Sequence, residues 1–139
     1  MSPLDFCLGL HRAGAALRLK LDEELGFLHG LGWDEFVLLS SLDGHPGGLP
    51  LRDLGRLLGL QASALLRRLP PLEKTGWLAR ERGAGGMRVV LRPGGRRLAR
   101  EARETAAHLC DVALGSDPAL PTAAEVLARM SSSPALRTP

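Results

Sequence analysis

The fold of this 139-residue chain is decided by residues 49–91, LPLRDLGRLLGLQASALLRRLPPLEKTGWLARERGAGGMRVVL. Leucines at positions 51, 54, 57 and 58 have the spacing of one buried helical stripe, which predicts a helix over 51–58. Gly59 follows at the position where helices often end in a left-handed residue. A second helix begins after Gln61, because leucines at 65, 69 and 72 again share one face.

Two short strands follow these helices. Residues 77–82 and 87–91 are predicted as strands, joined by the turn Gly83-Ala84-Gly85-Gly86. Helix, tight turn, helix and hairpin form the layout of a winged helix-turn-helix, which places its second helix in a DNA groove. Pro70-Pro71 interrupts that second helix in the sequence, and an interior proline removes a hydrogen bond and clashes one turn back. We therefore expect a short recognition helix over 62–69, followed by a proline-started turn through Lys74.

The flanking segments are predicted to be helical. Helices are expected over 4–25, over 33–42 with Gly32 as N-cap, over 96–113, and from a Thr122 cap to Met130. The predicted fold is mainly α with a small β-hairpin wing, a winged helix-turn-helix lobe with terminal dimerisation helices. Its expected divisions are an N-terminal dimerisation helix (1–30), the DNA-binding lobe (31–92), C-terminal dimerisation helices (93–131) and a flexible tail (132–139). The terminal helices carry apolar faces with little to pack on within the lobe, so a symmetric homodimer is expected.

Charge is distributed unevenly along the chain. The net charge is only +3, but residues 67–103 hold eleven Lys/Arg against three glutamates, a local balance of +8. A basic segment of this kind indicates a polyanionic partner, although a solvated arginine-rich face is an equally simple explanation. No stretch approaches the ~20 apolar residues of a membrane span, and no basic-then-apolar leader opens the chain. A cytoplasmic protein without membrane contact is therefore expected.

The series LGWDEFVLLSSL, LPLRDLGRLLGLQASALLRRL, LEKTGWLARE and VVLRPGGRRL resembles the MarR family of bacterial transcriptional regulators over roughly residues 5–130. The resemblance implies a helical homodimer that binds operator DNA through a winged helix-turn-helix in each subunit. It also implies a repressor that leaves the DNA when a small aromatic ligand binds or a thiol is oxidised. The sequence departs from the family at the wing, where the glycine-rich turn replaces an aspartate–arginine pair, so sequence readout by the wing tip is not expected.

Eight residues are predicted to contact double-stranded DNA. The resemblance places Ser63, Ala64 and Arg67 toward the major groove, with a bidentate arginine–guanine contact at Arg67. It places three wing arginines beside the phosphate backbone and the minor groove, mainly as phosphate contacts, with a free surface arginine as the alternative for each. The full predicted set is Gln61, Ser63, Ala64, Arg67, Arg68, Arg80, Arg82 and Arg88.

The two cysteines allow three interpretations. Cys7 lies in LDFCLGLH, which resembles the opening of the peroxide-sensing branch of the family, and Cys110 matches the position of a partner-subunit cysteine in some members. The chain contains no tyrosine, although that branch uses tyrosines to hold its thiolate. The second interpretation is that both cysteines are small buried apolar residues on packing faces. Zinc held by Cys7, His11, His108 and Cys110 is a third interpretation, but an i, i+2 pair diverges on a helix. We therefore predict no metal and no cofactor.

An effector pocket is expected where the first helix, the 33–42 helix and the 96–113 helix meet. Its candidate residues are His11, Arg12, Trp33 and Phe36, with core packing as the alternative for Phe36. No nucleophile has an evident base, and no glycine loop is joined to a helix as a phosphate cradle, so an enzyme is not expected. A competing interpretation is a winged-helix module that binds a protein and has lost tight DNA binding.

Overall fold

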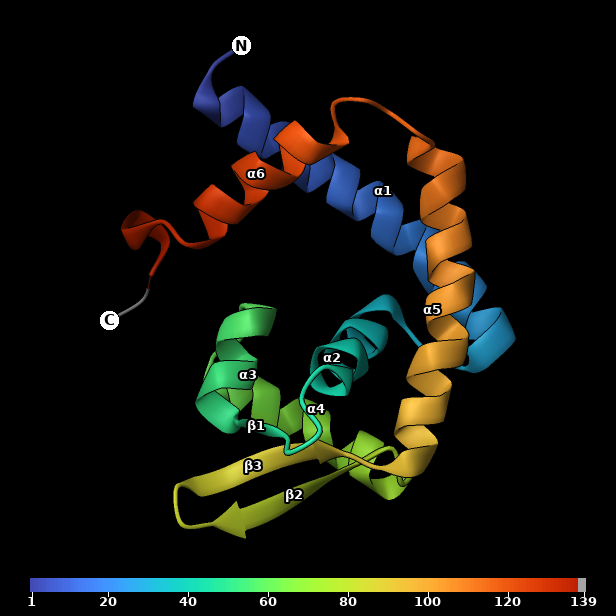
Figure 1. Ribbon diagram of the computed structural model, residues 1–139, viewed down its shortest axis with the longest axis vertical. Helices are drawn as coiled ribbons and strands as arrows, with labels where there is room; N and C mark the ends of the chain where they lie inside the picture. The colour runs from blue at the N-terminus through green and yellow to red at the C-terminus, as the bar shows by residue number, and fades with distance from the viewer. Residues whose placement is uncertain (138–139) are drawn as a thin grey trace. The chain divides into compact units, whose positions relative to one another are not determined.

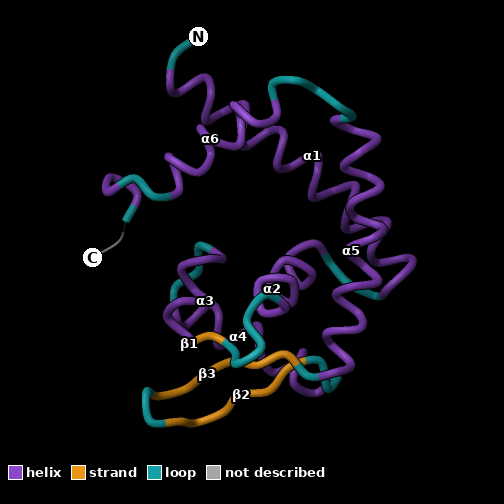
Figure 2. The backbone as a smooth tube through the Cα atoms, in the orientation of Figure 1, coloured by secondary structure: helices purple, strands orange, loops and turns teal. Residues whose placement is uncertain are grey.

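The computed structural model describes residues 1–137, and Figure 1 traces their path. Contacts between residues divide the chain into two units, Met1–Ala106 and the residues from Ala107 onward, and each unit is described by itself. The elements are, in order, α1 (Pro3–His29), α2 (Trp33–Asp43), β1 (Leu49–Pro50), α3 (Leu51–Leu58), α4 (Ala62–Lys74), β2 (Leu78–Gly83), β3 (Gly86–Leu91), α5 (Pro93–Leu114), α6 (Leu120–Ser131) and the 3-10 turn η1 (Pro134–Leu136). The mainly helical winged helix-turn-helix fold expected from the sequence is confirmed, and Figure 2 shows how few of its residues are strand.

The wing is the edge of a three-stranded antiparallel sheet with strand order β1-β3-β2. Strands β2 and β3 pair from Leu78 opposite Leu91 to Gly83 opposite Gly86. The predicted four-residue turn is therefore shorter, because Gly83 and Gly86 continue the ladder. Gly86 has φ +101°, a conformation that glycine adopts without a Cβ clash. Strand β1 was not predicted, because two residues are too few to show an alternating pattern.

The helix-turn-helix forms where the leucine spacing predicted it. Gly59 closes α3 at φ +66°, and its N–H donates to carbonyls of the last turn, as expected for a left-handed cap. Leu54 is fully buried, but Leu57 is 61% exposed, so the prediction that Leu57 belongs to the buried stripe is wrong. In this eight-residue helix, Leu54 and Gly55 are the buried residues.

Helix α4 corrects the prediction of a shortened recognition helix. It runs without a break through Pro70 and Pro71 to Lys74. The two prolines remove the amide donors that would reach the carbonyls of Leu66 and Arg67, one turn earlier. Both of these residues are exposed, so water can satisfy the freed carbonyls. Leucines on either side of the prolines are buried and hold both ends of the helix, namely Leu65, Leu69 and Leu72. Burial of such side chains, at roughly 1.5–3 kcal/mol each, offsets the local cost.

The core of the first unit is built almost entirely from leucine. The largest side chains at or below 2% exposure come from six helices and strands and from the loop before α2, namely Leu21, Leu25, Leu31, Leu38, Leu39, Leu42, Leu54, Leu65, Leu69, Leu78 and Val89. Helix α5 approaches the sheet through Gly95, where an added Cβ would lie 2.0 Å from the Trp77 carbonyl oxygen. Ala99, Ala102 and Ala106 continue this buried face of α5. Small residues therefore let α5 begin directly against the wing strands.

Several helix boundaries differ from the sequence prediction. Helix α1 extends past Gly26 to His29, and Gly30 caps it with φ +69°. At its start, Ser2 donates hydrogen bonds to Asp5 and thereby lowers the pKa of that carboxyl group. Helix α6 begins at Leu120 with Ala119 as N-cap, so the predicted Thr122 cap is wrong. The proposed tail includes η1 at Pro134–Leu136, and its last two residues, 138 and 139, lie outside the described part of the chain.

Candidate nucleic-acid interface

The outward side of α4 carries the main candidate DNA contacts. Leu65, Leu69 and Leu72 face the core, so Ser63 and Arg67 are turned toward solvent, and both are exposed. Gln61 is the exposed N-cap residue of the helix, and Ala64 is half-buried on its flank. Arg67 makes no hydrogen bond or ion pair with any other described residue. Its guanidinium is therefore presented on a helix that the core holds rigidly.

The wing arginines divide into one free and two tied side chains. Arg80 and Arg82 share a face of β2 with Leu78, since strand side chains alternate. Arg80 forms an ion pair with Glu73 near the end of α4, with 2.7 Å between nitrogen and oxygen, and so joins the wing to the recognition helix. Arg82 is exposed, and within residues 1–137 it has no ion-pair or hydrogen-bond partner. Arg82 is thus the wing arginine most available to a phosphate.

Arg88 has a structural role that the sequence did not indicate. Its Nε donates to the carbonyl of Gly47 at 3.2 Å, and its terminal nitrogen donates to the carbonyl of Gly48 at 3.0 Å. Gly48 has φ +79°, and an added Cβ would come within 2.5 Å of the Val89 carbonyl oxygen. Arg88 and Gly48 together fix the loop before β1 against the sheet. Arg88 is therefore less available for DNA than its position in the wing suggests.

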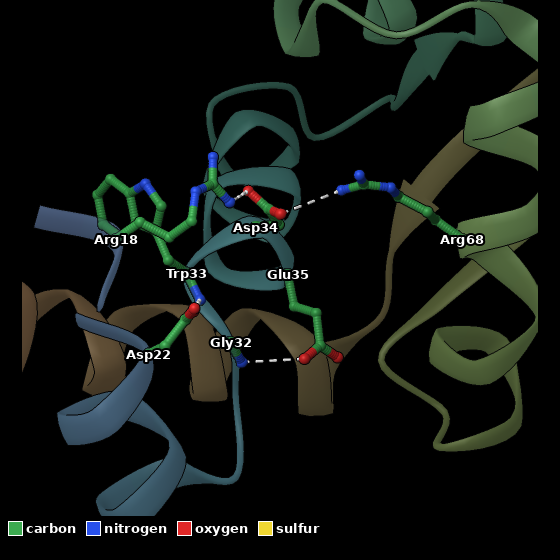
Figure 3. Close-up of polar contacts among 7 residues, drawn as sticks. All are labelled: Arg18, Asp22, Gly32, Trp33, Asp34, Glu35 and Arg68. Atoms are coloured by element: carbon green, nitrogen blue, oxygen red, sulfur yellow. Dashed lines mark hydrogen bonds and ion pairs between the residues drawn. The ribbon is translucent and has the colours of Figure 1, made fainter. Parts of the chain in front are cut away.

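Arg68 belongs to an ion-pair cluster that joins three helices, shown in Figure 3. Asp34, in the first turn of α2, accepts a hydrogen bond from Arg18 of α1 and lies 3.5 Å from a guanidinium nitrogen of Arg68 on α4. The hydrogen bond to Asp34 raises the pKa of Arg18, which stays charged. Next to this cluster, Asp22 accepts from the Trp33 amide at 2.6 Å, and Glu35 accepts from the Gly32 amide at 2.9 Å. Nothing in the sequence spacing indicated that α1, α2 and α4 meet at Asp34.

A pocket of about 220 Å³ lies between α2 and α4. Its walls combine apolar and charged side chains, namely Asp34, Glu35, Leu38, Arg68, Pro71 and Leu72. None of the four predicted ligand residues lines it. His11 and Arg12 are exposed on α1, whereas Phe36 is 6% exposed and packs against Trp33 with 5.5 Å between ring centroids. The alternative interpretation of Phe36 as a core residue is therefore the one that the structure shows.

The cysteines lie in different units. Cys7 is exposed on α1, Cys110 is half-buried on α5, and both thiols are free. The interpretation of Cys7 as a buried packing residue is therefore wrong for the single subunit. Within residues 1–137, no group of three or more His, Cys, Asp or Glu side chains is arranged to hold a metal ion.

Part of the basic segment is neutralised locally. At the start of α5, Arg96 and Arg100 lie 3.5 Å and 3.6 Å from the two carboxylate oxygens of Asp43, at the end of α2. Together with the ion pairs of Arg68 and Arg80, these two engage four of the eleven basic side chains of residues 67–103 in contacts inside the protein. The local charge of +8 therefore overstates the charge that is available to a partner.

Large apolar side chains are exposed on both terminal regions. In the first unit, the N-terminal part of α1 exposes Leu4, Phe6, Leu8 and Leu10. In the second unit, exposed apolar side chains occur near the end of α5, on α6 and in η1, namely Val112, Leu114, Leu127 and Leu136. Such a concentration of apolar surface is typical of a region that another protein chain covers. None of the helices formed by the described residues is both long enough and apolar enough to cross a membrane.

No family model matches the sequence, and no curated protein matches it. Solved structures do match the fold. A MarR-family transcriptional regulator from Rhodococcus sp. RHA1 has a TM-score of 0.85 at 18% identity, covering 92% of this chain and 94% of that one. The transcriptional regulator PA3341 has a TM-score of 0.77 at 28% identity, covering 90% and 94%. CouR from Rhodococcus jostii RHA1, solved with p-coumaroyl-CoA, has a TM-score of 0.82 at 18% identity, covering 90% of each chain. The fold implied by the MarR resemblance is confirmed.

Proposed function

We propose that this chain is a MarR-family transcriptional regulator that binds operator DNA as a homodimer and represses transcription. The observation that carries the proposal is the position of Arg67. This residue is exposed and unpaired within the described chain, on a helix anchored by three buried leucines. Arginine held in this way can form a bidentate contact with guanine in the major groove, while Gln61, Ser63 and Ala64 lie beside it. Arg82 would add a phosphate contact from the wing.

The exposed apolar side chains of the terminal helices support the homodimer. Leucines along the first turns of α1 are exposed in the single subunit, and a two-fold interface would bury the same patch on both copies. Dimerisation would also present two α4 helices to successive turns of DNA. The expected molecule in solution is therefore a dimer of twice 14.8 kDa.

The proposal also includes an effector that releases the protein from DNA. CouR, which shares the fold, was solved with p-coumaroyl-CoA, and this supports a small aromatic effector for the present chain. The exposed thiol of Cys7 supports an oxidant instead, since reactive cysteines must be accessible. Gel shifts with peroxide and with a panel of aromatic acids separate the two. Loss of binding in peroxide that a Cys7→Ser variant prevents would establish the thiol route.

DNA binding itself is tested by salt dependence and by one arginine. A DNA-binding dimer should lose affinity for its own upstream DNA with a log–log slope of about −0.9 per phosphate contact. Arg67→Ala should weaken binding, whereas Arg129→Ala, at an exposed position of α6, should leave it unchanged. A flat salt response together with an unaffected Arg67→Ala variant would rule out the proposal.

The second candidate function is a winged-helix module that binds a protein. It is favoured by the wing tip, Gly83-Ala84-Gly85-Gly86, which carries no charged side chain. Such a module would be dimeric and folded but would not retard any duplex at physiological salt. The same gel-shift series therefore distinguishes the two functions.

A further inference from the structure

The outward side of α4 is partly apolar, although it is the side proposed to face DNA. On a helical projection, Ser63, Arg67 and Lys74 lie opposite the three buried leucines, with Leu66 and Pro70 adjoining them along one flank. Leu66 is 36% exposed, and Pro70 is also exposed. On the same projection Glu73 lies beside Leu66, and its carboxylate is paired with Arg80. A continuous apolar strip thus runs beside Arg67.

Leu66 is partly covered within the subunit, but neither Leu66 nor Pro70 belongs to the buried core. The core contacts of α4 are made by Leu65, Leu69 and Leu72. Proline at position 70 removes a helix hydrogen bond and contributes no buried side chain in return. Leu66 and Pro70 are four residues apart and are therefore neighbours on the helix surface. The pair is better explained by what it contacts outside the subunit.

We infer that Leu66 and Pro70 contact thymine methyl groups beside the guanine that Arg67 binds, and so select thymine-containing operators. The inference rests on the proposed DNA-binding function. The 5-methyl group of thymine is the apolar feature that bases present in the major groove. The positive charges of Arg67 and Lys74 next to the strip favour a polyanion over an apolar protein surface.

The dimensions of the strip suit neighbouring base pairs. Residues four apart on a helix are separated by about 6 Å along its axis. Successive base pairs on one strand are separated by about 3.4 Å. Leu66 and Pro70 can therefore reach methyl groups within about two base steps of each other. Selectivity of this kind needs no hydrogen-bonding side chain, which agrees with the few polar groups on this helix.

The test replaces thymine by deoxyuridine, which removes only the methyl group. Duplexes that bind the full-length protein are first selected from a random pool. Each selected thymine is then changed to deoxyuridine, and affinities are compared at one salt concentration. Loss of a methyl contact should weaken binding roughly fourfold at each thymine facing α4, from the value of one buried methylene. Thymines at positions where the protein faces the minor groove serve as internal controls, because their methyl groups lie in the major groove on the other side of the duplex.

Two leucine variants assign the effect to α4. Leu66→Ala should lose the preference for thymine over deoxyuridine at the position that Leu66 contacts and keep it at the position that Pro70 contacts, whereas the parent protein prefers thymine at both. Leu57→Ala is the matched control, since Leu57 is an exposed leucine of the same lobe on α3. It should retain the parental preference for thymine. Circular dichroism checks that both variants stay folded.

The outcomes separate this inference from the proposed function. If the parent protein binds selected DNA but has the same affinity for thymine and deoxyuridine duplexes, the inference is overturned and the DNA-binding function stands. Equal loss of thymine preference in both leucine variants also overturns the assignment to Leu66. Failure to select any duplex at physiological salt overturns the proposed function, and the inference with it.

Discussion

Helix α4 and the β2–β3 wing carry similar numbers of arginines but present them differently. Helix α4 is held by three leucines with at most 3% exposure, and Arg67 extends from it without a partner among the described residues. In the wing, Arg80 is paired with Glu73 and Arg88 is bonded to the 47–48 loop, so only Arg82 is free. The comparison shows that a basic segment indicates a DNA-binding face only through those arginines that have no ion-pair or hydrogen-bond partner inside the protein.

The largest expected effect concerns the anchoring of α4. Leu69 is fully buried, so Leu69→Ala should reduce the free energy of unfolding by about 2–5 kcal/mol, through lost burial and a cavity. Urea denaturation measures this loss. Leu57→Ala, at a 61% exposed site of the adjacent helix, is the control and should change stability much less. Similar losses in the two variants would mean that α4 is not held by its buried face.

Arg67→Ala and Arg82→Ala compare helix α4 with the wing in DNA binding. Loss of a bidentate base contact should weaken operator binding by roughly 5- to 150-fold, equivalent to about 1–3 kcal/mol, and relax the preference at one base pair. Fluorescence anisotropy with operator and mutated-operator duplexes measures both effects. Arg82→Ala should instead weaken binding to all duplexes alike and reduce the salt slope by about 0.9. The comparison fails if Arg82→Ala changes base preference more than Arg67→Ala does.

Arg88 tests whether a tied wing arginine stabilises the fold rather than the complex. Arg88→Ala removes two hydrogen bonds from a charged donor to backbone carbonyls, which should cost about 1–3 kcal/mol of folding free energy. Thermal and urea unfolding record this loss. The salt slope of DNA binding, measured below the unfolding transition, should remain that of the parent. A reduced slope with unchanged stability would instead assign Arg88 to the phosphates.

The smallest expected effect is at the Asp34 cluster. Asp34 and Arg68 are 43% and 45% exposed, so their ion pair is largely screened by solvent. Asp34→Asn should therefore change folding stability by less than about 1 kcal/mol, even though it also affects the bond to Arg18. Differential scanning calorimetry at low and high salt measures the change. A larger loss that persists at high salt would show that the cluster holds α1, α2 and α4 together more strongly than its exposure implies.

The sequence by itself determined the order of the elements and the orientation of α4. Leucine spacing and Gly59 predicted α3, the tight turn and α4, because helical periodicity and the left-handed cap are local properties of the backbone. The same periodicity put leucines 65, 69 and 72 on one face, and the structure leaves Ser63 and Arg67 exposed on the opposite side. The two short strands of the hairpin and the N-cap at Gly32 were also predicted from local sequence, and the structure confirmed them.

Contacts between distant residues were decided only by the tertiary structure. The continuity of α4 through Pro70-Pro71 depends on buried leucines on both sides of the prolines, which outweigh a local preference to end the helix. Strand β1 exists because Leu49 pairs with Val89, forty residues later. The partners of Arg68, Arg80 and Arg88 likewise lie on other elements. Local propensity cannot predict such ion pairs, because each depends on how two separate segments are brought together by the core.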